Sequence, residues 1–258
     1  MEILEEKECL DRLQYVESSD SMYRVYWGDS SEIQQSRIDE FDELSFKIYM
    51  QSGYIDLNMD IEQLHREWKK KNPNTKITYL FLTNKDNTIV GGTRIISTKN
   101  QDIPLKERPD VFPTHFFLTG INYPPEIEDT SSLNIIEISR LVMERDLDKA
   151  MDRSKLIIKA LSTYAQSQNL DPTKNKITKV IGFIKRSALL TVRLSEGKDS
   201  EEDSAITVIK GSQLTREGQQ SYLSPYFEDK SKEKVSWNTF CIDVESYVNR
   251  CLKANNNI

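Results

Sequence analysis

The stretch Asn134-Ile135-Ile136-Glu137-Ile138-Ser139-Arg140-Leu141 indicates both the fold and the site. It has the composition of a buried strand, yet it carries a carboxylate, a hydroxyl and a guanidinium within four positions. A second strand upstream, Thr88-Ile89-Val90-Gly91-Gly92-Thr93-Arg94-Ile95-Ile96-Ser97, combines two glycines with an arginine. Charged groups are rarely buried unless they are paired. The pattern predicts a polar site in a sheet, with Glu137 and Arg94 as neighbours. The alternatives are a structural ion pair, or two side chains that face solvent.

Length and composition are typical of a globular protein. The 258 residues are 37% hydrophobic and 9% aromatic, which predicts a single domain spanning residues 1–258. The net charge of −6 disfavours non-specific binding to nucleic acid. No run of 18 apolar residues is present, so no membrane span is expected. The N-terminus lacks the pattern of a signal peptide, and the three cysteines are scattered, so we expect a cytoplasmic protein.

The order of the predicted elements is that of an α/β protein with a mixed sheet. Apolar alternation predicts strands at 21–27, 77–82, 88–97, 133–143, 177–184, 205–210 and 235–244. Helical spacing predicts helices at 31–52, 149–168 and 245–253, with a further candidate at 185–194. A hairpin followed by a β-α-β unit predicts a mixed twisted sheet with helices on both faces.

Two connections stand out by length or charge. Residues 99–132 form a long connection that contains Phe112, Phe116 and Phe117, and loops of this length often serve as lids or pocket walls. Residues 198–204 are predicted to be an acidic, mobile surface loop within the domain.

Several common chemistries lack their motifs. Gly91-Gly92 lies inside a strand and does not form a dinucleotide-binding fingerprint, and no phosphate-binding loop is present. His65 and His115 are the two histidines, and neither has metal-ligand spacing. No serine occupies a nucleophile elbow. We therefore expect neither a metal nor a cofactor.

The residues that remain suit a reaction that needs one base and a shaped groove. Glycines within a strand indicate a bulge or a close approach of another backbone, so an extended ligand could lie there. Attack of an amine on a thioester requires a base for the amine proton and a donor for the developing oxyanion. Glu137 could be that base, directly or through a water. Ser139 follows two residues later on the same face and could donate the hydrogen bond.

These elements resemble the acyl-homoserine-lactone synthase family, whose members synthesise quorum-sensing autoinducers on the fold of the GCN5-related N-acyltransferases. The family signature has a "Gly-x-x-Arg-Leu-x-x-Thr" strand and a later "Glu-x-Ser-Arg" strand. The matching positions are Gly91, Arg94, Thr98, Glu137, Ser139 and Arg140. The related long-chain N-acyl amino acid synthases share much of this pattern. The resemblance covers about residues 40 to 142.

The resemblance implies transfer of an acyl group from an acyl carrier protein or coenzyme A thioester to a small amine. In the lactone synthases the amine comes from S-adenosylmethionine, which then lactonises. Both molecules would be substrates rather than cofactors. The resemblance makes Glu137 the catalytic base, with Ser139 near the thioester. Arg94 and Arg140 would position the site.

The first helix departs from the family pattern. Leu-Arg-x-x-x-Phe is represented by Leu44-Ser45-Phe46-Lys47-Ile48-Tyr49, so Ser45 stands in the place of the arginine and Tyr49 in that of the phenylalanine. Asp56 and Asp60 are what remains of an acidic run that could attract the amine substrate. The sequence therefore leaves three interpretations open: lactone synthesis, N-acyl amino acid synthesis, and a non-catalytic binding or regulatory protein on the same fold.

The donor is expected to lie along the strand of Glu137, with its phosphate near the start of the helix 149–168. Amides at a helix N-terminus bind phosphate, and Arg153 would assist. An acidic carrier protein would need basic contacts, for which Lys185, Arg186 and the cluster 66–71 are candidates. The alternative is that these residues are ordinary surface charges.

Overall fold

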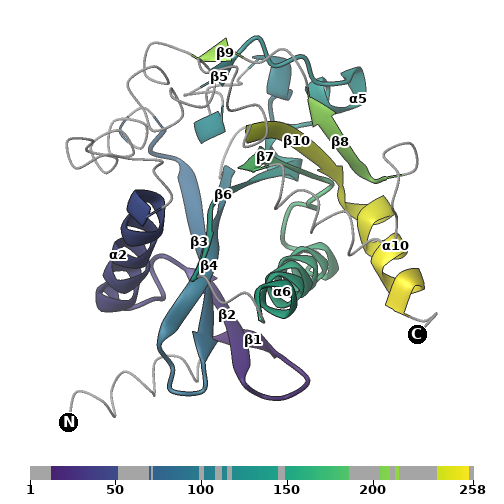
Figure 1. The fold of residues 1–258 in the computed structure, drawn as a ribbon. Helices are drawn as coiled ribbons and strands as arrows, with labels where there is room; N and C mark the ends of the chain where they lie inside the picture. Colours follow the sequence, from purple (N-terminus) through teal and green to yellow (C-terminus); the bar gives the residue numbers. More distant parts are fainter. Residues whose placement is uncertain are drawn as a thin grey trace, which may run out of the picture.

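The computed structural model describes residues 13–51, 70, 72–98, 102–107, 112–114, 118–144, 149–185, 204–209, 213–214 and 237–255. Within these ranges an eight-stranded sheet forms the centre of the molecule (Figure 1). Its strands, in spatial order, are β1 (Gln14–Glu17), β2 (Tyr23–Asp29), β3 (Thr75–Asn84), β4 (Ile89–Thr98), β6 (Ile135–Met143), β7 (Lys179–Lys185), β10 (Trp237–Asp243) and β8 (Ile206–Ile209).

The remaining elements flank this sheet. A small second sheet pairs β5 (Leu118–Thr119) with β9 (Gln213–Leu214). Single 3₁₀ turns occur at η1 (Leu105–Glu107) and η3 (Ser132–Asn134). The helices are α2 (Gln35–Gln51), α5 (Pro125–Glu128), α6 (Ala150–Leu170) and α10 (Val244–Asn255).

The mixed sheet with helices on both faces is confirmed. β6 and β7 pair in parallel, joined by α6, and the other neighbouring strands of this sheet pair antiparallel. Helix α2 lies on one side of the sheet, and α6 and α10 lie on the other (Figure 1). We call these sides the α2 face and the α6 face.

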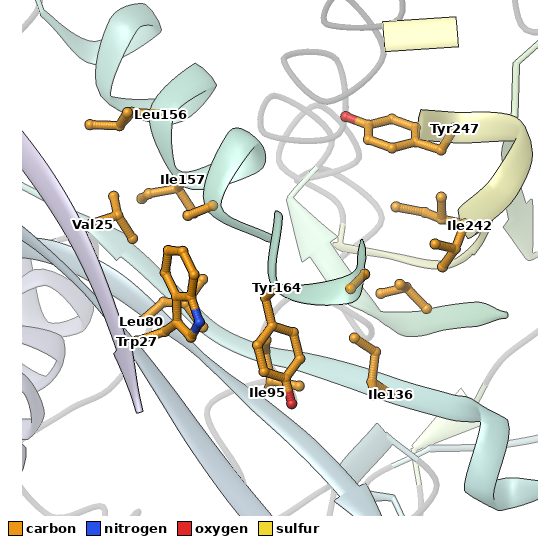
Figure 2. Packing of buried hydrophobic residues seen from close by; sticks show 14 of the residues in the cluster. Val25, Trp27, Leu80, Ile95, Ile136, Leu156, Ile157, Tyr164, Ile242 and Tyr247 are labelled. Atoms are coloured by element: carbon orange, nitrogen blue, oxygen red, sulfur yellow. The ribbon is translucent and has the colours of Figure 1, made fainter. Parts of the chain in front are cut away.

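Alternation along β3 and β4 builds the two layers of the core. Tyr79 and Phe81 pack on the α2 face with Phe41 of α2. Leu80 and Leu82 point the other way and belong to the cluster on the α6 face. In Figure 2 the side chains of α6 and α10 meet those of the strands in this second cluster. Successive side chains of a strand point to opposite faces of the sheet. Because helices cover both faces here, the central strands are apolar almost throughout.

The predicted boundaries hold with small differences. The first helix begins at Gln35 rather than near Ser31, and β6 begins at Ile135 after the turn η3. The connection 99–132 contains short pieces of structure, β5 and α5 among them. Strand β1 was not predicted, because Gln14–Glu17 has no apolar alternation and is at most half-buried. The predicted helix at 185–194 lies outside the described residues apart from Lys185, which ends β7, and the predicted acidic loop at 198–204 lies outside them apart from Ser204.

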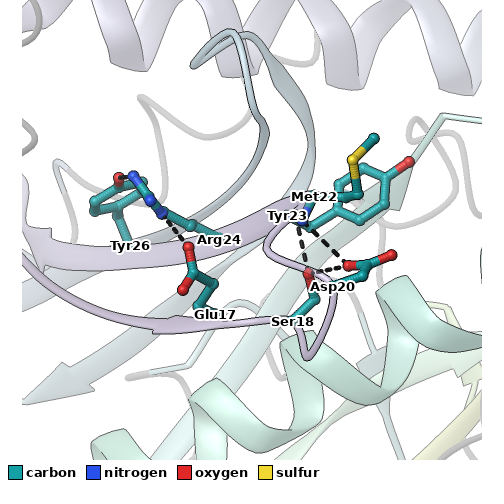
Figure 3. A network of polar contacts seen from close by, with 7 residues as sticks. All are labelled: Glu17, Ser18, Asp20, Met22, Tyr23, Arg24 and Tyr26. Atoms are coloured by element: carbon teal, nitrogen blue, oxygen red, sulfur yellow. Dashed lines mark hydrogen bonds and ion pairs between the residues drawn. The ribbon is translucent and has the colours of Figure 1, made fainter.

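Side-chain hydrogen bonds close the hairpin of β1 and β2 (Figure 3). The Ser18 hydroxyl donates to Asp20 and accepts from the Tyr23 backbone N–H. Across the two strands, Arg24 Nε donates to Glu17 Oε1 at 2.7 Å. Short polar side chains that satisfy backbone groups favour a turn at this place.

Gly92 lies in close contact with the backbone of the neighbouring strand, as a glycine within the strand predicts. Its φ is +153°, and a Cβ atom there would lie 2.2 Å from the carbonyl oxygen of Leu80 and 3.0 Å from Phe41. A backbone carbonyl cannot move aside as a flexible side chain can. Only glycine fits this position without displacing β3.

We expect Gly92→Ala to lower the free energy of unfolding by about 2–4 kcal/mol, since overpacking and strain at a special φ add together. Urea unfolding followed by circular dichroism measures this. Gly28→Ala is the matched control, because the nearest atom to its Cβ is the end of the Leu13 side chain. A Gly92→Ala protein as stable as Gly28→Ala would contradict this account of Gly92.

Candidate active site

Glu137 lies near the middle of the sheet on the α2 face. Its Cα partners on the neighbouring strands are Ile96 of β4 and Ile181 of β7. Both isoleucines are fully buried, and Glu137 itself has an exposed fraction of 0%. The carboxylate therefore sits in a row of apolar side chains, away from water.

The surroundings of Glu137 raise the pKa of its carboxyl above the ordinary value. Its Oε2 accepts a hydrogen bond of 2.9 Å from the backbone N–H of Thr114. Its Oε1 is buried and has no hydrogen-bond partner in the part of the chain that the structure describes. Burial raises the pKa of Glu137 to about 8, although Thr114 and the charge of Arg94 lower this pKa in part. A buried carboxyl with such a pKa is a candidate functional group.

Arg94 lies on the same face as Glu137, in the next row across the sheet. Its Cα partners are Tyr79 on β3 and Ser139 on β6. Burial and then the charge of Arg140 lower the pKa of Arg94. Arg94 and Glu137 are both buried, so the interpretation that they face solvent is wrong. The charge of Arg94 reaches Glu137 and favours its ionised form.

Ser139 is the second polar group turned toward the site. It shares the α2 face with Glu137, as the two-residue spacing predicts, because its partner Arg94 faces Tyr79 and the α2 cluster. Within the described ranges its buried Oγ has no hydrogen-bond partner. A buried polar atom left unsatisfied costs about 1–3 kcal/mol. A substrate that hydrogen-bonds to Ser139 would recover that cost.

A β-bulge brings Arg140 to the same face. Between the pairs Gly92–Val142 and Arg94–Ser139, β6 contains one residue more than β4. Arg140 takes the left-handed conformation at this point, with a φ of +53°. Two successive side chains of β6 therefore point toward α2, and Arg140 forms an ion pair with Asp42 of that helix. Without the bulge, Arg140 would lie opposite Glu137 and Ser139.

Helix α2 completes the polar cluster. Tyr49 is buried, and burial raises its pKa while the charges of Arg140 and Arg94 lower it. Tyr49 thus lies near both guanidinium groups, and its role in binding substrate stays a prediction. Ser45, which replaces the arginine of the family pattern, is buried and donates its hydroxyl to the carbonyl of Phe41 at 2.7 Å. Ser45 adds no charge to the cluster.

We expect Asp42→Asn to lower the free energy of unfolding by about 2 kcal/mol. The exposed fractions of the paired side chains are 7% for Arg140 and 24% for Asp42, so the change leaves a nearly buried guanidinium without its counter-ion. Asp39→Asn, on the exposed side of α2, is the control and should change stability by less than about 0.5 kcal/mol. Chemical denaturation of both variants measures the two changes in the free energy of unfolding. Equal effects would exclude a stabilising role for the Asp42–Arg140 pair.

Arg153 is not brought to Glu137. It lies near the start of α6 on the α6 face, where its guanidinium donates to the Tyr23 hydroxyl at 2.6 Å and lies 4.6 Å from the centre of the Tyr23 ring. Arg153 is buried in this arrangement. Its expected role at the phosphate of the donor stays a prediction.

Several predicted site residues lie outside the described part of the chain. They are Asp56, Asp60, Arg186, most of the basic cluster 66–71 and the side chain of Lys185. Their roles stay predictions.

Two neighbours of Glu137 had no direct signal in the sequence. Thr114 belongs to the segment 112–114 of the long connection, whose Phe112 is fully buried in the core cluster of the α2 face. Tyr123 is also buried, and burial raises its pKa, with a further increase from the charge of Glu137. The length of the connection was the one available signal, because no local pattern shows which of its residues meets β6.

Two further observations concern ligands and membranes. No group of three or more metal-ligating side chains occurs among the described residues. None of the helices described there is both long and apolar enough to cross a membrane.

Comparison with known proteins gives similarity at the level of structure. Neither the family models nor the curated proteins match the sequence. The solved structures that are similar include the acyl-homoserine-lactone synthase LasI, with 14% identity and a TM-score of 0.49 over 86% of this chain and 90% of that one. They also include FeeM, an N-acyl amino acid synthase from uncultured soil microbes, with 13% identity and a TM-score of 0.49 over 90% and 98% of the two chains.

A more distant similarity extends to the acetyltransferases. A GNAT-family acetyltransferase from Staphylococcus aureus Mu50 has 10% identity and a TM-score of 0.42, over 85% of this chain and 99% of that one. The structural neighbours are thus GNAT-like proteins, among them lactone and N-acyl amino acid synthases.

Proposed function

We propose that this protein is an N-acyltransferase that moves a fatty acyl group from a thioester to an amine. The observation that carries the proposal is the buried Glu137, whose pKa is raised to about 8 and whose Oε1 has no hydrogen-bond partner among the described residues. A base is most effective when its pKa lies near the working pH. Neither a surface carboxylate nor a carboxylate in a direct ion pair would have this property.

The chemistry follows from the groups around Glu137. The amine nitrogen attacks the thioester carbonyl, and Glu137 Oε1 takes the proton that the nitrogen loses. The Ser139 hydroxyl donates a hydrogen bond to the developing oxyanion. When the tetrahedral intermediate collapses, the carbon–sulfur bond breaks, and the proton passes from Glu137 to the departing thiolate. The products are an amide and a free thiol.

The sheet offers a place for the thioester arm beside β6. The parallel ladder between β6 and β7 ends at the pair Ile138–Gly182, although β6 continues to Met143 and β7 to Lys185. The backbone of β6 beyond Ile138 is therefore not engaged in that ladder. An extended arm that carries amide groups could hydrogen-bond there, next to Ser139.

Apolar side chains on the same face of the sheet as Glu137 suit a fatty acyl chain. Phe112, Leu118, Tyr123, Ile127 and Cys241 are all buried in the cluster of the α2 face. The Cys241 thiol is not a competing nucleophile, because burial raises its pKa to about 12.

The identity of the amine that accepts the acyl group is the more specific part of the proposal. Following the sequence resemblance, we infer lactone synthesis from S-adenosylmethionine, with long-chain N-acylation of an amino acid as the alternative. The donor is an acyl carrier protein or a coenzyme A thioester. The buried carboxylate with an unsatisfied oxygen favours the two enzymes over the third interpretation, a non-catalytic protein on this fold.

Mass spectrometry of lipid extracts from bacteria that express the chain tests the proposal. New acyl-homoserine lactones would support the first acceptor, and new N-acyl amino acids would support the second. Cells that express Glu137→Gln are the matched control and should lack the new product. The absence of any new acylated amine, with the purified chain also inactive on acyl thioesters and amines, would overturn the assignment as an enzyme.

A further inference from the structure

We propose that Thr114 is the positioning residue of Glu137, whose backbone N–H holds one carboxylate oxygen and leaves the other as the basic oxygen. The inference rests on the proposed acyl transfer, and it assigns a role in that reaction to the connection between β4 and β6. Thr114 would not touch the reacting atoms. It would fix the direction of the carboxylate that does.

The geometry around the carboxylate carries this inference. The backbone nitrogen of Thr114 lies 2.9 Å from Oε2 of Glu137, and Oε1 has no partner in the described ranges. Thr114 and Glu137 both have exposed fractions of 0%. A buried carboxylate held at one oxygen cannot turn freely, because its rotation would break a charge-assisted hydrogen bond. The two oxygens are therefore not equivalent.

The charged and titratable groups that face Glu137 come from several elements. The charge of Arg94 of β4 lowers the pKa of Glu137. The charge of Glu137 in turn raises the pKa of Tyr123, which precedes α5. Cys241 of β10 lies in the same row, beyond Ile181. Thr114 differs from these groups because it makes a direct hydrogen bond. His115, which follows Thr114 in the sequence, lies outside the described residues.

The connection that carries Thr114 is anchored on both sides of this contact. Leu118 of β5, four residues later, is buried and pairs with Leu214 of β9. Phe112, two residues before Thr114, is fully buried. The hydrogen bond thus links Glu137 to a chain segment that is itself held in place by residues close to it in sequence.

A backbone substitution gives the sharpest test. Replacing residue 114 by the α-hydroxy acid analogue of threonine exchanges its N–H for an ester oxygen and keeps the side chain. The N–H stabilises the ionised carboxylate of Glu137. Its loss should therefore raise the pKa of Glu137 by about one to two units. The pH profile of kcat/KM should move upward by the same amount. Thr114→Val is the matched control, because it retains the N–H and removes only the hydroxyl, which lowers the pKa of Glu137 less than the backbone N–H does, so it should move the profile upward by less than the ester does.

A second measurement does not depend on activity or on altering residue 114. In the unmodified protein, the NMR signal of the Thr114 amide should titrate together with the Glu137 carboxyl carbon, and this titration should vanish in Glu137→Gln. An unchanged Glu137 pKa in the folded ester protein would overturn the proposal. So would a Thr114 amide that does not respond to the titration of Glu137. If no acyl transfer is found but the amide titrates, the contact stands and the proposed function fails.

Discussion

Purified Glu137→Gln protein is expected to transfer acyl groups about 10²–10⁴ times more slowly than the wild type, because the substitution removes the base and keeps its shape. The introduced glutamine would still accept the Thr114 N–H through its amide oxygen, so the fold should be retained. The loss should lie in kcat more than in KM, since proton removal belongs to the transition state.

Steady-state kinetics with an acyl thioester and the amine identified by mass spectrometry would measure this loss. Glu43→Gln, on the exposed side of α2, is the control and should leave the rate unchanged. Turnover of Glu137→Gln within a factor of about two of the wild type would show that another group removes the proton.

The stability of the wild type is expected to fall as the pH rises from about 4.5 to 8, relative to Glu137→Gln. Burial raises the pKa of Glu137 from its ordinary value of 4.5 to about 8. Between these values the folded state holds a proton that the unfolded state has released, so a higher pH favours unfolding. The contribution is fully present below pH 4.5 and is lost as the pH passes 8.

The size of this effect follows from the shift. At about 1.36 kcal/mol for each pH unit, the shift corresponds to roughly 5 kcal/mol. Urea unfolding of both proteins at intervals from about pH 5 to pH 9 measures it, and the difference between them removes the contributions of other groups. A difference that stays constant with pH would mean that Glu137 ionises normally in the folded protein.

The fold followed from the sequence where local pattern and burial agree. The hairpin of β3 and β4 and the β6-α6-β7 unit were predicted, because apolar alternation and a long amphipathic helix are local signals. The edge strand β1 was missed, since its half-exposed residues have no such pattern. The pairing of β5 with β9 joins segments that are far apart in sequence, so no local sequence pattern predicts it.

The site was predictable only in part, for a related reason. Glu137, Ser139 and Arg94 stood out because polar residues interrupt apolar strands, and alternation placed Glu137 and Ser139 on one face. Arg140 reaches the α2 face only because of the bulge, and the bulge depends on the pairing of β6 with β4. Thr114 and Asp42 reach the site from other parts of the fold, and only the folded chain shows that they do.

The order of strands has a consequence for synthesis of the protein on the ribosome. β10 follows both β7 and β8 in the sequence, yet it inserts between them in the sheet. Glu137, Thr114 and most of the α2 face are made long before it. Until β10 emerges, β7 is a sheet edge with unpaired backbone groups, which is prone to pair with other chains. The site therefore acquires its complete surroundings only after β10 has been made, long after Glu137 itself.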